Sequence, residues 1–147
     1  MRILLFGKNG QIGSRLQYSL STIGEVVAVG RSQLDLENFG NLQSILESHQ
    51  PDVIVNAAAY TNVEQAEVES TRAHNINCGA VKVMARYAAR EGIVLVHYSS
   101  DYVFDGKKKG PYAEQDVTSP LKRLWGDKAR WRGRYSRSAM PSSDTAD

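Results

Sequence analysis

Three glycines near the start of the chain have a spacing that suits phosphate binding. They lie in Gly7-Lys8-Asn9-Gly10-Gln11-Ile12-Gly13, between an apolar run at residues 2–6 and leucines at roughly helical spacing. In this strand–turn–helix order, Gly7 permits a tight turn, Gly10 lets a pyrophosphate approach the backbone, and Gly13 lets helix and strand pack closely. The N–H groups and dipole at the helix start then favour phosphates. An ordinary glycine turn is the alternative, because the spacing differs from the tighter G-x-G-x-x-G form.

A second candidate for cofactor binding is Arg31, which follows an expected strand at residues 25–29. An acidic side chain about twenty residues beyond the glycine turn would bind the ribose 2′-hydroxyl of NAD. The strand end carries no acid here, and the planar guanidinium of Arg31 could pair with the 2′-phosphate of NADP instead. The sequence therefore favours NADP over NAD, with a solvated surface charge as the alternative for Arg31.

Strands and helices that alternate from residue 1 to about residue 100 would position these groups. This order predicts an α/β fold with a doubly wound parallel sheet, in which ligands bind at the carboxyl ends of the strands. The glycine turn, Arg31, Ala58–Thr61 and Ser99–Asp101 all follow expected strands, so we expect them to converge. The expected strands are 2–6, 25–29, 53–55 and 93–96, and the expected helices follow the glycine turn and cover 39–49 and 71–90.

Two further groups of polar residues allow more than one interpretation. Glu64, Glu67 and Glu69 are expected to form an acidic surface. Asn77 falls inside the expected helix 71–90, where it could hold water or backbone near the site, or could equally be a polar surface residue. Ile76, Ala80, Val83, Met84 and Tyr87 form the expected inner stripe of that helix.

Length and composition are those of one soluble globular domain. The 147 residues include no run of eighteen apolar residues and no signal-peptide pattern at the start. Cys78 is the only cysteine, which excludes an internal disulfide and a cysteine metal cluster, and the three histidines lack metal-ligand spacing. We therefore expect a cytoplasmic protein with no membrane partner and no metal site.

The formal net charge of +2 is unevenly distributed. Residues 1–121 carry 11 Lys/Arg and 13 Asp/Glu, a balance of −2, whereas residues 122–147 carry 7 and 3, a balance of +4. A basic tail can indicate affinity for nucleic acid. This tail has no helical or repeat organisation, and we expect no nucleic-acid partner.

Several segments together carry a family resemblance. Besides the glycine turn, they are Asp35-Leu36, Asn56-Ala57-Ala58-Ala59-Tyr60-Thr61 and Ser100-Asp101-Tyr102-Val103-Phe104-Asp105-Gly106. Residues 1–121 resemble the dTDP-4-dehydrorhamnose reductase family of the extended short-chain dehydrogenase/reductase superfamily. The resemblance implies a Rossmann-like NAD(P)-binding domain over residues 1–121. It also implies reduction of the 4-keto group of dTDP-6-deoxy-L-lyxo-4-hexulose to dTDP-L-rhamnose.

The resemblance also implies roles for individual residues. Ser100 would be the catalytic hydroxyl, and Ser100 and Asp101 would contact the sugar of a dTDP-sugar substrate. Some full-length relatives are implied to form homodimers and to bind magnesium at the dimer contact, through ligands that this chain lacks. The residues implied to bind the cofactor are Gly7, Gly10, Gln11, Ile12, Gly13, Arg31, Asp35, Leu36, Ala58, Ala59, Tyr60, Thr61 and Tyr98.

The resemblance ends after Leu121. The family continues Asn-Val-Tyr-Gly-x-Thr-Lys, in which the tyrosine donates the proton, but residues 122–128 read Lys-Arg-Leu-Trp-Gly-Asp-Lys. Lys128 matches the catalytic lysine, and Leu124 replaces the tyrosine. Read one base later, the codons of this segment permit Asn, Val, Tyr, Gly, Glu, Thr and Lys. We therefore hypothesise that a one-base insertion near codon 122 produced a tail at residues 122–147 that does not belong to the family.

This departure changes the expected activity. Without the phenol and the later sheet strands, we expect a truncated Rossmann-like chain with very little reductase activity. Two alternatives stay open within the superfamily: another nucleotide-sugar epimerase or dehydratase, and a non-catalytic NADP-binding regulatory subunit.

Overall fold

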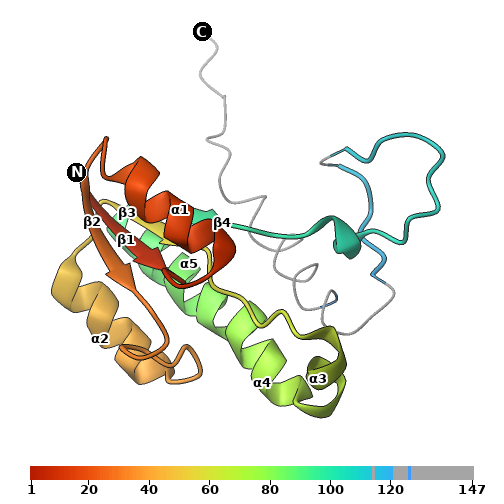
Figure 1. Cartoon of the computed structure of the whole chain (residues 1–147), viewed down its shortest axis with the longest axis horizontal. Coiled ribbons are helices and arrows are strands. Elements are labelled where there is room, and N and C mark those ends of the chain that lie inside the picture. The colour runs from red at the N-terminus through yellow and green to blue at the C-terminus, as the bar shows by residue number, and fades with distance from the viewer. Residues whose placement is uncertain (114, 121–125, 127–147) are drawn as a thin grey trace, which may run out of the picture.

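The computed structural model describes residues 1–113, 115–120 and 126. Its centre is a parallel sheet with the strand order β2-β1-β3-β4 (Figure 1). The strands are β1 (Arg2–Phe6), β2 (Glu25–Val29), β3 (Val53–Asn56) and β4 (Val94–His97). Every neighbouring pair of strands is parallel, as the alternating sequence pattern predicts.

Apolar side chains on β1 fill both faces of the sheet, because successive residues of a strand point to opposite sides. Leu4 and Phe6 pack toward α2 (Phe39–His49) and α5 (Ala80–Glu91). Ile3 and Leu5 pack toward α1 (Gln11–Leu20) on the other face. Figure 1 shows this layering, in which α1 lies on one side of the sheet. Ile54 and Val55 of β3 are also buried, one on each face of the sheet.

The segment between β3 and α5 differs from the expected single helix. It contains α3 (Val63–Val68), which the sequence analysis did not predict, and α4 (Ser70–His74). A π-helical turn, Asn75–Gly79, then joins α4 to α5. The expected helix at residues 71–90 is therefore interrupted by one wide turn, which hydrophobic spacing alone does not reveal.

On the face of the sheet that α1 covers, the described residues place no helix over β4. α1 packs over β1 and β2, whereas Val94 and Val96 of β4 are 60 % and 41 % exposed. The chain then leaves the sheet after β4 and leads into a separate loop region (Figure 1). In the part of the chain that the structure describes, no helix has the length and apolar character needed to cross a membrane.

The expected tail, residues 122–147, lies outside the described residues except for Gly126. Lys128 and Leu124 are therefore not placed by the structure. The boundary at residue 121 and the altered reading frame stay predictions.

Candidate dinucleotide-binding site

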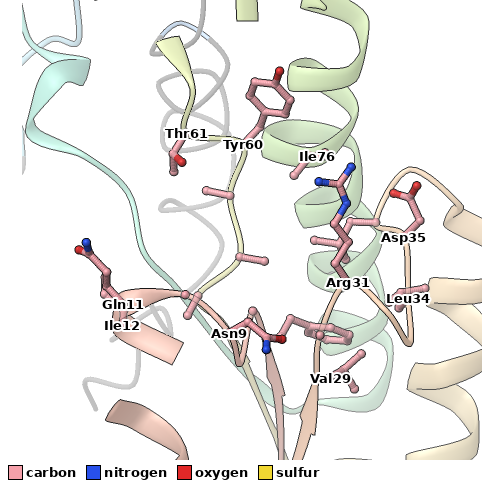
Figure 2. Close-up of a pocket in the computed structure, with 18 residues that line it drawn as sticks. Asn9, Gln11, Ile12, Val29, Arg31, Leu34, Asp35, Tyr60, Thr61 and Ile76 are labelled. Atoms are coloured by element: carbon pink, nitrogen blue, oxygen red, sulfur yellow. The ribbon is translucent and has the colours of Figure 1, made fainter. Parts of the chain in front are cut away.

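A pocket of about 690 Å³ opens where β1, β2 and β3 end. Figure 2 shows Gln11 and Ile12 on one side of it and Arg31 and Ile76 on the other. This volume is typical of sites for small molecules and cofactors. The residues that line the pocket are Phe6, Gly7, Asn9, Gly10, Gln11, Ile12, Val29, Gly30, Arg31, Leu34, Asp35, Leu36, Ala57, Ala58, Ala59, Tyr60, Thr61 and Ile76.

The glycine turn forms the floor of the pocket through a backbone conformation that favours glycine. Gly7 has a φ of +87°, and its N–H donates to the Val29 carbonyl at 3.0 Å. A Cβ at Gly7 would lie 2.6 Å from the backbone nitrogen of Ala58. Gly7 therefore permits both the sharp turn and the close approach of the loop after β3.

The start of α1 faces the pocket without a side-chain cap. Gly10 is the N-cap residue and makes no side-chain cap bond, and the first turn has no acidic residue. The first N–H groups of a helix lack partners within the helix and carry partial positive charge. The N-terminus of α1 is therefore suited to an anionic group such as a phosphate.

The end of β2 places a cation and a carboxylate in the same pocket. Arg31 and Asp35 are both exposed and both line it. No ion pair joins the Arg31 guanidinium to an acid of the described chain. The Asp35 carboxylate accepts the N–H of Glu37 at 3.1 Å. Arg31 is thus available to a ligand phosphate.

The end of β3 supplies a wall of small residues. Asn56 is fully buried, and its Oδ1 accepts the N–H of Ala58 at 3.0 Å. Its Nδ2 lies 3.2 Å from Nδ1 of His97 on β4. The bonds of the Asn56 amide thereby fix the backbone at the start of the segment Ala57–Ala59. These three residues are half-buried, and their small side chains leave room for a flat ligand.

Tyr60 and Glu69 form a polar network behind this wall. The Tyr60 hydroxyl donates to Glu69 Oε2 at 3.1 Å, and Arg72 forms ion pairs with Glu69 and with Glu37. Partial burial and the bond to Glu69 raise the pKa of the Tyr60 phenol. Hydrogen bonds from Gln65 and then from Tyr60 lower the pKa of Glu69. Glu64 and Glu67 are exposed, in keeping with the expected acidic surface, whereas Glu69 is half-buried and is paired with Arg72.

The structure brings together most of the residues predicted to bind the cofactor. Gly13 is the exception within the turn, because it is buried beneath the turn and does not line the pocket. Tyr98 and Asp101 follow β4 and also lie outside the pocket lining. The predicted members that do line it are Gly7, Gly10, Gln11, Ile12, Arg31, Asp35, Leu36, Ala58, Ala59, Tyr60 and Thr61.

Ser100 lies at the start of a short 3-10 helix, Asp101–Val103, and is not part of the pocket lining. Its Oγ accepts the N–H of Tyr102 at 3.3 Å and donates to Asp101 Oδ1 at 3.3 Å. In this conformation the hydroxyl acts as a helix cap, which is the structural alternative to a catalytic role.

Sequence reasoning missed several lining residues for different reasons. Asn9 lies inside the recognised turn, and Phe6 and Val29 end the recognised strands, so their positions could have indicated the site. Leu34 is buried in the loop after β2, where an apolar side chain has no periodic signal. Ile76 reaches the pocket from the π-helical turn, and no simple sequence pattern predicts that turn.

A parallel sheet with a glycine turn at the carboxyl end of its first strand defines a Rossmann-like nucleotide-binding fold. Comparison with known proteins agrees with that class and narrows it. The sequence model of the family described as RmlD substrate binding domain matches residues 1–135. The chain therefore belongs to this family.

Three relatives show how far the similarity extends. A dTDP-4-dehydrorhamnose reductase of Burkholderia thailandensis is 48 % identical over 121 residues, which cover 82 % of this chain and 41 % of the relative. The crystal structure of a hypothetical dTDP-4-dehydrorhamnose reductase from Sulfolobus tokodaii has a TM-score of 0.83 and 38 % identity, covering 90 % of this chain and 51 % of that one. A reductase from Bacillus anthracis, solved in complex with NADP, has a TM-score of 0.82 and 30 % identity, covering 93 % and 49 %.

The chain spans less than half the length of the curated dTDP-4-dehydrorhamnose reductases that it matches. Residues 1–135, which the family model matches, include every residue that lines the pocket described above. Among the described residues, no group of three or more His, Cys, Asp or Glu side chains is placed to hold a metal ion.

Proposed function

We propose that this chain is the NADP-binding part of a dTDP-4-dehydrorhamnose reductase. In that reaction NADPH supplies a hydride to C4 of dTDP-4-keto-6-deoxy-L-lyxo-hexulose, a proton goes to the carbonyl oxygen, and dTDP-L-rhamnose results. The observation that carries the proposal is the pocket at the ends of β1, β2 and β3, which joins a glycine turn to Arg31, an arginine that has no ion-pair partner among the described residues. The 48 % identical relative bears the name of this reductase.

The residues of the pocket fit a phosphorylated dinucleotide. The uncapped start of α1 suits the pyrophosphate, and Ala58 and Ala59 leave room for a flat group against the backbone. Arg31 is proposed to bind the 2′-phosphate, because a guanidinium binds phosphate through two parallel hydrogen bonds. Asp35 and Leu36 are proposed to lie at the adenine side. Gln11, Ile12, Tyr60 and Thr61 would complete the wall.

The proposed catalytic role of Ser100 is to donate a hydrogen bond to the substrate carbonyl. To do so, its hydroxyl must exchange the bond to Asp101 for one to the substrate. The Ser100 hydroxyl would donate one hydrogen bond before and after this exchange. The new bond would stabilise the negative charge that develops on the substrate carbonyl oxygen. Proton transfer needs a separate acid, and the sequence has Leu124 where the family has tyrosine. Lys128 alone does not replace that phenol.

The missing tyrosine favours a second candidate function, a regulatory subunit that binds NADP without catalysis. The two candidates share cofactor binding and differ in turnover. Titration of the chain with NADPH, followed by the fluorescence of the nicotinamide, tests the shared step. Absence of saturable binding would overturn both candidates.

Turnover of the 4-keto sugar separates the candidates. We expect no measurable reduction by the chain as written, and reduction by a version whose reading frame is restored from codon 122. A restored version that binds NADPH but does not reduce the sugar would favour the regulatory candidate. Reduction by the unaltered chain at an ordinary enzyme rate would contradict the proposed need for the tyrosine. A cytoplasmic location, the dimer and the magnesium of full-length relatives stay predictions.

A further inference from the structure

Asn77 is a buried polar residue that supports the pocket from behind. Its side chain lies in the π-helical turn, and the residue is 1 % exposed. Oδ1 accepts the N–H of Tyr60 at 2.9 Å, and Nδ2 donates to the carbonyl of Tyr60 at 3.1 Å. One amide thereby bonds both polar main-chain groups of a residue 17 positions away, as a neighbouring strand would.

Tyr60 needs such support because it lies just beyond the sheet. β3 ends at Asn56, so the ladder to the neighbouring strands does not include residue 60. A third bond, from the Tyr60 hydroxyl to Glu69, fixes the end of the side chain. Tyr60 and the flanking residues Ala59 and Thr61 all line the pocket. The position of this wall therefore depends on bonds made outside it.

The π-helical turn places two neighbouring residues in complementary positions. Ile76 lines the pocket directly, as Figure 2 shows, whereas Asn77 bonds the wall without lining it. The turn is held against α2 on its other side, since a Cβ at Gly79 would lie 2.5 Å from the ring of Phe39. π-helical turns within helices are frequent at functional sites, where they re-aim side chains.

We propose that Asn77 is a positioning residue, which fixes the Tyr60 main chain so that the wall formed by Ala58–Thr61 has the shape that binds the cofactor. The inference rests on the proposed function and adds a residue that does not itself contact the ligand. The effect on affinity depends on the fraction of molecules in which the wall has the conformation that binds the cofactor. If the two bonds are lost, the loop samples other conformations, and the apparent affinity falls in proportion to the competent fraction.

The test compares Asn77→Leu with Leu46→Val in the full 147-residue chain. Leucine has nearly the shape of asparagine but cannot bond to Tyr60. Leu46 is fully buried in α2 and does not line the pocket, so its substitution loosens the core without touching the wall. NADP⁺ affinity is measured by calorimetry at a temperature where circular dichroism shows each protein folded. We expect Kd to rise about tenfold or more for Asn77→Leu and to stay unchanged for Leu46→Val.

Asn77→Asp provides a second readout, which decides the question if Asn77→Leu does not fold. A protonated carboxylic acid can accept the Tyr60 N–H and donate to its carbonyl, whereas a carboxylate cannot donate. The charged groups around Tyr60 are Glu69, Arg72 and Arg31. We expect the ratio of variant to wild-type Kd for NADP⁺ to approach one near pH 5 and to rise about fivefold or more near pH 8. Taking the ratio at each pH cancels the titration of the cofactor phosphate.

The outcomes distinguish this inference from the proposed function. If the wild-type chain does not bind NADP⁺, the proposed function fails, and the inference fails with it. If the wild type binds and the Asn77 variants match it while folded, the positioning role alone is overturned. The positioning role is likewise overturned if Leu46→Val weakens binding as much as Asn77→Leu, because both effects would then reflect general loss of stability.

Discussion

Gly13 lies so close to Gly7 that a Cβ on Gly13 would be 2.0 Å from the Gly7 carbonyl oxygen. The Gly10 N–H donates to that same carbonyl at 3.0 Å, which closes the turn. The three glycines of the turn therefore have different roles. Gly7 and Gly13 are required by the backbone itself, whereas Gly10 is exposed and has room for a Cβ 3.4 Å from its nearest neighbour.

We predict that Gly13→Ala destabilises the fold and that Gly10→Ala impairs only binding. In Gly13→Ala, the clash of the added methyl group with backbone atoms should cost about 3 kcal/mol or more of the free energy of unfolding. Urea unfolding measures this loss, and Gly110→Ala is the control because nothing lies within 4 Å of its Cβ position. Gly10→Ala should keep the wild-type midpoint while its methyl obstructs the phosphates. Equal midpoints for Gly13→Ala and wild type would contradict the packing argument.

The second prediction concerns cofactor preference. Arg31→Ala should weaken NADPH binding about tenfold or more, because a charge-assisted contact to the 2′-phosphate is lost. NADH lacks that phosphate, so its affinity should change little. Parallel fluorescence titrations with NADPH and NADH measure the ratio of the two dissociation constants. Arg15→Ala, which removes an exposed arginine of α1 outside the pocket lining, is the control. If Arg31→Ala weakened the binding of NADPH and NADH equally, Arg31 would not be the residue that binds the 2′-phosphate.

The third prediction is a dependence of stability on acid. Hydrogen bonds from Gln65 and Tyr60 hold the pKa of Glu69 below its usual range. A depressed carboxyl pKa contributes stability above its ordinary value of about 4.3, and that contribution is lost as pH falls through the lowered value. Glu69→Gln should therefore lower Tm near pH 7 and flatten the fall of Tm toward about pH 3. Glu67→Gln, at an exposed position of α3, should follow the wild-type curve.

The fourth prediction follows from the uncovered side of β4. Val94 and Val96 expose apolar surface on β4, a strand that has only one neighbour in the described sheet. Such edges promote association between chains. Val94→Lys should reduce concentration-dependent light scattering of the purified chain. Val117→Lys introduces the same charge at a position that is 87 % exposed but belongs to none of the described strands, and it should have a smaller effect.

The fifth prediction concerns the gene. The nucleotide sequence around codon 122, read one base later, should encode Asn-Val-Tyr-Gly-x-Thr-Lys, with tyrosine over Leu124 and lysine over Lys128. Sequencing this region is sufficient to decide. A shifted frame without Tyr-x-x-x-Lys there would refute the insertion hypothesis and leave Leu124 as a feature of the family member itself.

The sequence predicted the sheet and most of the pocket because both depend on local patterns. β-branched runs indicate strands, and a parallel sheet brings the ends of those strands together without further information. It predicted the support around Tyr60 only in part: holding backbone near the site was one of the two interpretations left open for Asn77, and the structure shows that one. Asn77 and Glu69 act through contacts 17 and 9 residues distant along the chain, and neither residue type distinguishes a buried partner from a solvated side chain. Ser100 shows a different limit, since its contacts are local, but the residue type alone does not distinguish a cap from a catalytic hydroxyl.

The π-helical turn changes the direction in which the side chains of α5 point relative to those of α4. An ordinary helix advances about 100° per residue, so a wide turn shifts every later side chain around the axis relative to the earlier ones. Met84 and Tyr87 can then pack in the core, while Ile76 lines the pocket and Asn77 bonds the main chain of Tyr60. Deleting one residue between 75 and 79 would rotate one face out of register, so this short segment should tolerate substitution better than a change in length.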